Sequence, residues 1–384
     1  MSEWKKVKLG DISSAIQTGP FGSQLHQSDY SDIGVPVVMP KDIINGSIDE
    51  STIARVENHH VERLSRHKIS EGDILYARRG DVGKCAYTVF AQQGWLCGTG
   101  CLRVTIDKAK ALPKFIFFQL QKRETIGWVE KHAIGATMLN LNTSILSDVP
   151  IELPSLSIQH RIASILSRYD SLIENYQKQI KLLEEAAQRL YKEWFVDLHF
   201  PGHENTKIVD GVPEGWEKSN INNMLTFHRG YDLTHKDFID GPYPVVGSTS
   251  IIGCHNKYKI EGPGIVTGRS GSLGVYQLIW ENFWPHNTSL YINDFKGHEV
   301  FFIYCMLKTV DFTTLNSGGA IPSLNRNTLS NILVVEPPKD LQQDFSRKAI
   351  PLFKKQKTLQ SQIRLLTEAR DRLLPKLMSG EIAV

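Results

Sequence analysis

Apolar residues recur at seven-residue intervals in two separate stretches of the chain. The first series is Ile162, Tyr169, Tyr176, Leu183 and Leu190, and the second is Phe345, Leu352, Leu359, Leu366 and Leu373. A second, weaker line of apolar residues fills the heptad of the first series, at Ile158, Ile165, Leu172 and Ala186. This pattern is typical of a coiled-coil seam. We expect the two helices to pack on each other; the alternative is that each lies on its own domain.

The two helical stretches belong to a long internal repeat. Residues 179–190 reappear as residues 362–373, at an offset of 183 positions that also pairs Pro154 with Pro337, Gln159 with Gln342, and 141–142 with 324–325. Upstream, residues 72–83 resemble residues 263–274 and Trp4 matches Trp216, but the offset drifts. The globular part of the second copy is therefore shorter by about 29 residues. Constant helices and variable heads are the pattern to explain.

These patterns predict an α+β chain with four parts. We expect a first head at 1–153, a spacer helix at 154–198, a linker and second head at 199–336, and a second spacer helix at 337–384, with the two helices antiparallel. Pro351 suits the first turn of a helix, so a short helix is expected before the second long one. Within the heads, 74–76, 102–106, 265–266 and 289–292 are expected strands, and 115–120 and 299–307 buried helices.

Composition excludes little by itself. The 384 residues carry 44 basic and 41 acidic side chains, a formal net charge of +3, and 41% are hydrophobic. Bulk charge neither demands nor excludes nucleic acid. Five cysteines give no disulfide framework, the first residues do not form a signal peptide, and the longest apolar run, 300–307, is too short for a membrane span. We expect a cytoplasmic protein that makes no membrane contact.

The sequence favours binding over catalysis. Residues 80–85 contain a Gly-Lys pair without the Ser or Thr of a phosphate-binding loop, and 336–339 lack the groups of an amino-methyltransferase loop. Cys97 and Cys101 are expected on one face of a strand, without a second pair at zinc spacing. Asp73 and Asp81 correspond to Gly264 and Ser272, which a duplicated nuclease site would not tolerate. We therefore expect no catalytic residue, metal or cofactor in this chain.

Several motifs occur in order along the chain. They are 18–25, 72–75 running into 78–83, 139–142 followed by Pro154 and Gln159, 193–197 followed by 211–216, and 377–382. Together they resemble the specificity subunit of type I restriction–modification systems, over nearly the whole chain and in duplicate. A fragment of a fused restriction–methylation enzyme, or a coiled-coil adaptor without nucleic acid, are the alternatives.

The resemblance implies a mechanism. Each head would read one half of a split, asymmetric site in double-stranded DNA, and the paired helices would set the distance between the halves. Two methyltransferase subunits would supply S-adenosylmethionine, and restriction–translocase subunits, where present, ATP and magnesium. Helices of roughly 30 residues would be about 45 Å long. That length equals about 13 base pairs of DNA.

DNA contacts are expected from polar and basic residues near Gly-rich turns, because such turns allow close approach to base edges. In the first head the candidates are Gln17, Ser23, Gln24, Lys41, Arg78, Arg79 and Lys84. In the second head they are His228, Arg229, Tyr231, Ser248, Arg269, Ser270 and Asn287. Arg78 and Arg269 are the strongest pair, because they precede equivalent turns. Phe21 is expected in the core.

Overall fold

A computed structural model describes residues 4–135, 139–269, 274–310 and 332–384. The chain divides into two compact units. The first contains the residues up to 174 together with 363–384, and the second contains 175–362. Each unit therefore consists of one head and part of each long helix, whereas the sequence placed the helices in parts of their own.

The first head is built on an antiparallel sheet of four strands. Its strands, in spatial order, are β2 (Ser13–Thr18), β11 (Cys101–Ile106), β8 (Ile74–Ala77) and β9 (Cys85–Tyr87). The buried helix α2 (Pro113–Leu120) supplies much of the apolar core beside this sheet. A separate two-stranded ribbon pairs β1 (Lys5–Lys8) with β12 (Pro150–Leu153). The expected strands and the buried helix are therefore confirmed.

Further elements enlarge the first head. A second sheet has the order β10 (Leu96–Cys97), β4 (Val35–Val38), β7 (Ala54–Val56) and β3 (Tyr30–Ser31). Smaller elements are the hairpin of β5 (Ile43–Ile44) and β6 (Ser47–Ile48), and the helices α1 (Asn58–Arg63), α3 (Arg123–His132) and α4 (Thr143–Ser147). Cys97 and Cys101 lie on different strands, β10 and β11, and share one core cluster, so their placement on one strand was wrong.

The second head repeats the plan. Its main sheet has the order β16 (Thr226–Arg229), β22 (Ser289–Asp294), β19 (Gly264–Gly268) and β20 (Tyr276–Ile279). Its smaller sheet has the order β18 (Ile251–His255), β17 (Tyr243–Val246) and β21 (Trp284–Pro285). The helix α7 (Val300–Leu307) corresponds to α2, and the ribbon of β15 (Glu217–Asn220) and β23 (Leu333–Glu336) corresponds to β1 and β12. The hairpin β13 (Ile208–Val209) and β14 (Val212–Pro213) and the short helix α6 (Ile221–Met224) precede this sheet.

The repeat extends to side-chain hydrogen bonds. Gln159 donates from Nε2 to the carbonyl of Pro154 at 2.8 Å, and Gln342 donates to the carbonyl of Pro337 at 2.8 Å. Both amides are buried, where an unpaired polar group would be costly. The Pro and Gln pairs at offset 183 therefore fix the start of each long helix. Residues 324–325, the expected partners of 141–142, lie outside the described residues.

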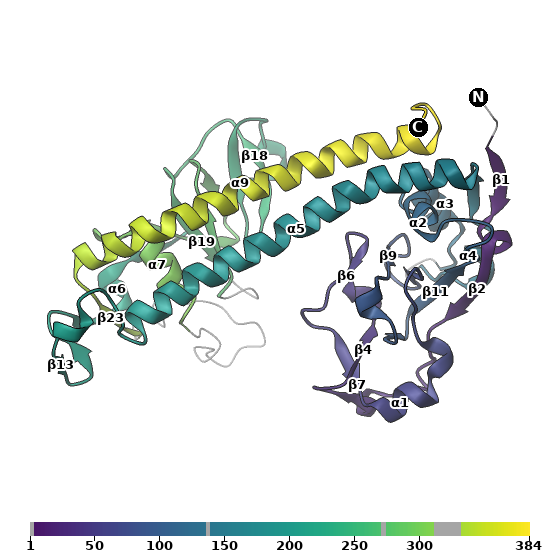
Figure 1. The fold of residues 1–384 in the computed structure, drawn as a ribbon. Coiled ribbons are helices and arrows are strands. Elements are labelled where there is room, and N and C mark those ends of the chain that lie inside the picture. The colour runs from purple at the N-terminus through teal and green to yellow at the C-terminus, as the bar shows by residue number, and fades with distance from the viewer. Residues whose placement is uncertain (1–3, 136–138, 270–273, 311–331) are drawn as a thin grey trace. The chain divides into compact units, whose positions relative to one another are not determined.

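The long helices are α5 (Leu156–Phe195) and α9 (Lys339–Met378), with 40 residues each. At 1.5 Å per residue each helix is about 60 Å long, whereas helices of roughly 30 residues and about 45 Å were expected. In the first unit Arg370 contacts Asp170, and in the second Gln356 contacts Glu184. In both pairs the two residue numbers add up to 540, so the helices run antiparallel in one register (Figure 1).

The ten predicted seam residues are buried to different degrees. Ile162, Phe345 and Leu359 are fully buried, and the other seven are half-buried. Leu172 and Ala186, from the weaker line, are exposed, so that line was wrong there. The heads add buried positions that the heptads did not predict: Ala163, Leu166, Ala187, Tyr191, Trp194, Phe195, Ala349, Phe353, Leu374, Leu377 and Met378. Each helix therefore packs both on its partner helix and on a head.

Pro351 does not separate two helices. The helix α9 continues through it from Lys339, so the expected short preceding helix was wrong. A proline inside a helix loses one hydrogen bond and crowds the preceding turn. Pro351 is exposed, while its neighbours Ala349 and Phe353 are buried in the core of the second unit. We attribute the continuity of the helix to this packing.

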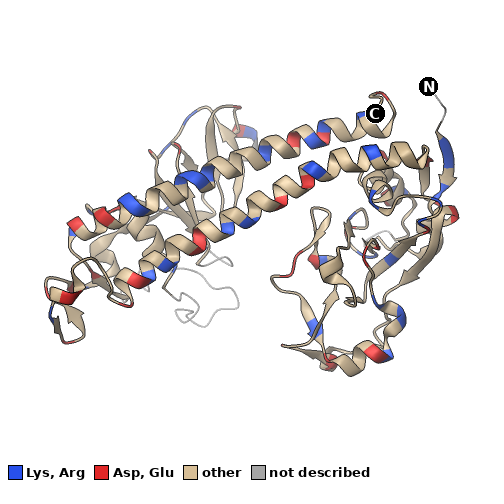
Figure 2. Ribbon diagram, viewed as in Figure 1, with Lys and Arg blue, Asp and Glu red and all other residues tan. Residues whose placement is uncertain are grey.

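Charge differs between the two long helices. Figure 2 shows basic and acidic residues interspersed along α5, whereas α9 carries a run of basic residues between Asp344 and Glu368: Arg347, Lys348, Lys354, Lys355, Lys357 and Arg364. In the described parts of the chain, no helix combines the length and the hydrophobicity that a membrane crossing requires.

Candidate nucleic-acid interface

In both heads, two segments of backbone touch at the end of the main sheet. A Cβ atom at Gly19 would lie 2.0 Å from the carbonyl oxygen of Gly98, and one at Gly230 would lie 2.1 Å from that of His286. Contacts this short do not occur between a real Cβ and backbone. The loop after the first strand of each sheet therefore requires glycine, which explains its presence in 18–25 and again at 230.

The two strongest candidates occupy equivalent places. The amide of Arg78 donates to the carbonyl of Gly100 at 2.7 Å, and the amide of Arg269 donates to that of Thr288 at 3.2 Å. Each arginine directly follows the third strand of its main sheet. Arg269 is exposed and Arg78 is half-buried. The structure thus supports the alignment on which both were chosen.

An exposed aromatic ring from the loop after β2 lies beside Arg78. The guanidinium carbon of Arg78 lies 5.8 Å from the centre of the Phe21 ring. Phe21 is 50% exposed, so its expected place in the core was wrong. Ser23 and Arg79 are exposed in the same region, and Gln24 accepts a hydrogen bond from the Phe21 amide through Oε1 at 3.1 Å. Arg78, Phe21, Ser23 and Arg79 form the accessible group of the first head.

Two other candidates of the first head are exposed but already engaged. Lys84 pairs with Asp81, with 2.8 Å between Nζ and Oδ2. Lys41 donates from Nζ to the carbonyl of Thr52 at 3.3 Å. Exposed contacts of this kind contribute little to stability. Both lysines therefore remain able to meet a phosphate.

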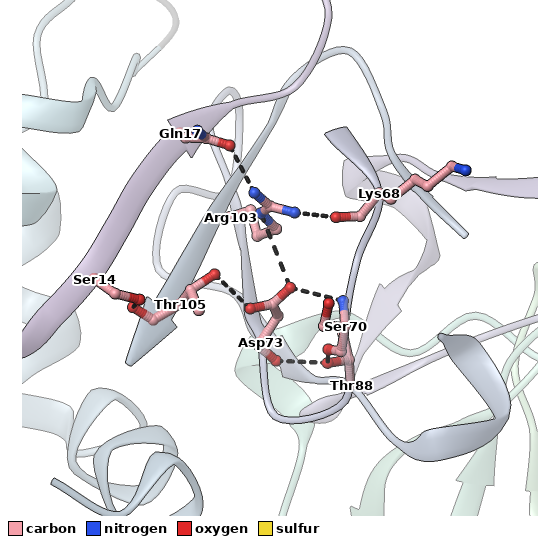
Figure 3. A network of polar contacts seen from close by, with 8 residues as sticks. All are labelled: Ser14, Gln17, Lys68, Ser70, Asp73, Thr88, Arg103 and Thr105. Atoms are coloured by element: carbon pink, nitrogen blue, oxygen red, sulfur yellow. Dashed lines mark hydrogen bonds and ion pairs between the residues drawn. The ribbon is translucent and has the colours of Figure 1, made fainter. Parts of the chain in front are cut away.

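Gln17 takes part in a network of hydrogen bonds around Asp73 and Arg103. Its Oε1 accepts from Nη2 of Arg103 at 2.6 Å, at the edge of a polar network (Figure 3). At the centre of that network Asp73, 1% exposed, accepts from Thr105 Oγ1 at 2.5 Å and from the Ser70 amide at 2.8 Å. The Nε atom of Arg103 lies 3.9 Å from the carboxylate. This carboxylate anchors strands, and the amide of Gln17 helps to hold Arg103.

Candidates of the second head gather around one loop, residues 286–288. Asn287 donates from Nδ2 to Oδ1 of Asp232, and the guanidinium of Arg229 lies 3.6 Å from the same oxygen. Ser248 donates from Oγ to the carbonyl of Thr288 at 2.7 Å. The structure therefore brings Arg229, Asn287 and Ser248 to the end of the sheet where Arg269 lies. Asp232 was not predicted, because nothing in the local pattern marks it.

Tyr231 and His228 flank this cluster. The hydroxyls of Tyr231 and Tyr291 lie 3.0 Å apart, and their rings stack with centres 6.0 Å apart. Burial raises the pKa of Tyr291, and the hydrogen bond to Tyr231 adds to this rise. His228 lies opposite Tyr291 in the sheet and is half-buried. The remaining candidate, Ser270, lies outside the described residues.

Two buried cysteines, Cys85 and Cys97, are unsuited to metal binding or nucleophilic chemistry. Burial raises the pKa of the Cys85 and Cys97 thiols to about 12, so both stay protonated at neutral pH. A metal ligand or nucleophile needs the thiolate. In the part of the chain that the structure covers, no three His, Cys, Asp or Glu side chains are grouped so as to hold a metal ion.

Comparison with known proteins agrees with this architecture. Residues 1–185 and 213–364 match the family described as type I restriction modification DNA specificity domain. The chain is 26% identical, over its whole length and 94% of the relative, to the type I restriction enzyme MjaIX specificity subunit of Methanocaldococcus jannaschii. It is 22% identical, over the full length of both proteins, to the HindI specificity subunit of Haemophilus influenzae.

A solved structure shares the fold. The crystal structure of a type I restriction–modification S subunit from M. genitalium superposes with a TM-score of 0.60 at 19% identity, covering 97% of this chain and 96% of that one. The family matches twice along the chain, and each match covers one head with its repeated sheet and most of one long helix. The chain therefore belongs to the type I restriction–modification DNA specificity family.

Proposed function

We propose that the two heads of this chain read the two halves of a split, asymmetric DNA site. One observation carries the proposal: both heads place an arginine after the third strand of the same sheet, but surround it with different side chains. Arg78 has Phe21 beside it, whereas Arg269 lies at the end of the sheet that holds Asp232 and Asn287. Equivalent scaffolds with different tips suit two different half-sites. A chain with two unlike heads has no two-fold constraint on its site.

The antiparallel helices are proposed to set the gap between the half-sites. Each has 40 residues, and polar pairs tie them together in both units. Helix length changes by 1.5 Å per residue, so the gap should change with length while the bases read stay the same. The side chains of the two helices outside the core are the proposed docking surface for partner subunits.

The chemistry is proposed to lie in those partners. Two methyltransferase subunits would bring S-adenosylmethionine and methylate the DNA, and restriction subunits, where present, would bring ATP and magnesium. This chain would contribute no catalytic residue and no cofactor. The complex would act on DNA in the cytoplasm. Because the net charge of the chain is only +3, local arginines and lysines and the partners must supply most of the attraction to phosphate.

Mapping of methylated bases in the genome of the host tests the proposal. We expect a bipartite, non-palindromic motif that is methylated in cells with this chain and unmethylated in cells without it. A second strain should carry α5 and α9 each lengthened by one heptad. We expect the same two half-motifs there, separated by a different gap.

Two outcomes would contradict the proposal. A continuous motif would exclude two separate readers. Methylation that does not depend on the chain would leave it as an adaptor without DNA recognition.

A further inference from the structure

A hollow of about 460 Å³ opens in the second head beside strand β21. Its wall includes the rings of Trp284 and Tyr258 and the side chains of three lysines, Lys236, Lys257 and Lys259. All of these residues belong to the second unit. None of them was among the residues expected to bind DNA.

The hollow combines aromatic rings with ammonium groups. Trp284 is only 9% exposed, so its ring is a fixed part of the wall. The ammonium group of Lys259 lies 4.7 Å from the centre of the Trp284 ring. Together these groups favour a ligand that offers acceptors.

Charge in the hollow is positive. None of the three lysines forms an ion pair with a residue that the structure describes. The carboxylate that contributes to the described wall, Asp237, accepts a hydrogen bond from Thr234 Oγ1 at 2.6 Å. Three ammonium groups against one engaged carboxylate leave a surplus of positive charge. An anionic ligand with several oxygen acceptors fits this wall.

At the place that corresponds to this hollow, the described part of the first head is filled by apolar core. In the strand register Trp284 lies opposite Val245, and Leu96 takes the equivalent place opposite Val37. Leu96 is fully buried in an apolar cluster with Leu25, Val37, Val56, Val61 and Leu64. Helix α1, which supplies Val61, covers that position in the first head. The shorter second head has an aromatic and basic wall where the first head has closed core.

Tyr231 connects the hollow with the candidate interface. The ammonium group of Lys259 lies 5.4 Å from the centre of its ring. Leu233 lines the hollow, and its carbonyl lies 3.1 Å from Nε2 of His286, in the loop that bears Asn287. A DNA strand at the Arg229–Asp232–Asn287 cluster would therefore pass close to the hollow.

We propose that the hollow binds a phosphate group of the DNA backbone beside the second half-site. The lysines would neutralise its charge and donate to its oxygens, and the Trp284 ring would hold Lys259 at the wall. This inference rests on the proposed function, and adds to it an anchor in the second head that reads no bases. Phosphate contacts of this kind position a protein on DNA without selecting sequence.

The salt dependence of DNA binding tests the proposal. The full chain, assembled with its methyltransferase subunits, should be compared with the Lys257→Gln/Lys259→Gln variant. The slope of log K against log salt concentration should fall in magnitude by about 0.9, the amount expected for one phosphate contact. Binding should weaken equally on the specific site and on a scrambled second half-site. The matched control, Lys207→Gln/Lys218→Gln, removes two exposed lysines of the same unit and should keep the original slope.

The outcomes separate this inference from the proposed function. Sequence-dependent binding with an unchanged slope in the variant would overturn the phosphate site alone, as would an equal fall in the control. Absence of sequence-dependent binding by the unaltered chain would overturn both. A third arm titrates pyrophosphate against tryptophan fluorescence. In one outcome pyrophosphate saturates the unaltered chain but not the variant, while the salt slope of DNA binding is the same in both. That outcome would assign the hollow to a free phosphate compound and overturn the DNA assignment.

Discussion

Arg370 donates from Nη1 to Oδ1 of Asp170 at 2.9 Å, across 200 positions of sequence. The contact joins α9 to α5 inside the first unit. Lys114, on α2 of the head, lies 3.9 Å from the other oxygen of the same carboxylate. Burial lowers the pKa of Lys114, while Asp170 opposes this effect. One carboxylate thus stands between two cations, one from the helix pair and one from the head.

Removal of this carboxylate should cost more than removal of either cation. Asp170→Asn leaves Lys114 and Arg370 facing each other, mostly buried, without the carboxylate between them, while Arg370 keeps its more exposed partner Asp371. We expect a loss of about 1–3 kcal/mol in the free energy of unfolding, between the values typical of exposed and of fully buried pairs. Urea unfolding measures it. The control Glu368→Gln breaks the exposed pair with Arg372 and should change stability by less than about 0.5 kcal/mol. A smaller loss for Asp170→Asn than for Arg370→Gln would contradict this account.

Gly19 should not accept a side chain. In Gly19→Ala the new methyl group would meet the carbonyl of Gly98 at 2.0 Å, so the loop must move. We expect a destabilisation of about 1–3 kcal/mol, measured by thermal unfolding. Gly22→Ala is the matched control three residues away, because nothing lies within 4 Å of its added atom. Equal melting temperatures for the two variants would show that the close approach is unimportant.

Acid should weaken the first head through His67. Burial and the neighbouring Arg66 lower the pKa of His67, and Arg66 donates from Nε to its Nε2 at 2.9 Å. Near pH 6.5 His67 therefore binds a proton in the unfolded chain more readily than in the folded chain. The stability that this histidine contributes is complete above about pH 6.5 and falls as the pH drops from there toward its folded pKa.

The test of this linkage is the slope of stability against pH. In His67→Gln we expect a flatter dependence below about pH 6.5, measured by urea unfolding at a series of pH values. His59→Gln, at an exposed histidine, should keep the original slope. An unchanged slope in His67→Gln would mean that other groups cause the acid sensitivity.

Arg269→Ala should weaken DNA binding through the second half-site only. If its guanidinium meets a base or phosphate there, the loss should be about 1–3 kcal/mol on the complete site. It should vanish on DNA whose second half-site is scrambled. Arg78→Ala is the reciprocal variant and should lose affinity through the first half-site. The affinity of the methyltransferase complex for each DNA decides the matter. Loss on the scrambled DNA equal to that on the complete site would refute the assignment.

Much of the fold could be predicted from the sequence, because it is written twice. The offset of 183 aligned Pro154 with Pro337 and Gln159 with Gln342, and the structure gives both pairs the same hydrogen bond. The strands around Ile74 and Ile265 were recognised from β-type runs between glycines. Local patterns of this kind report secondary structure well.

Contacts between distant residues could not be predicted in the same way. Gln17 stays a predicted DNA contact, but nothing in the local sequence indicated that its amide oxygen also holds Arg103, which lies 86 positions away. Pro351 was expected at a helix start, but α9 continues through it. The packing to which we attribute this continuity comes from the head, so the local sequence does not show it. Lys259 drew no attention in sequence, since its neighbours Trp284 and Tyr231 come from other segments. Long-range packing decided each case.

The two-stranded ribbons have a consequence for how this gene can evolve. In the first head Lys5 lies opposite Leu153, and in the second Glu217 lies opposite Glu336. The first and last strands of a head are therefore neighbours, about 5 Å apart. A foreign head inserted between such strands would meet the same two attachment points. Recombination at these repeated flanks would exchange a whole head as a cassette and, if the proposed function holds, change one half of the recognised sequence in a single event.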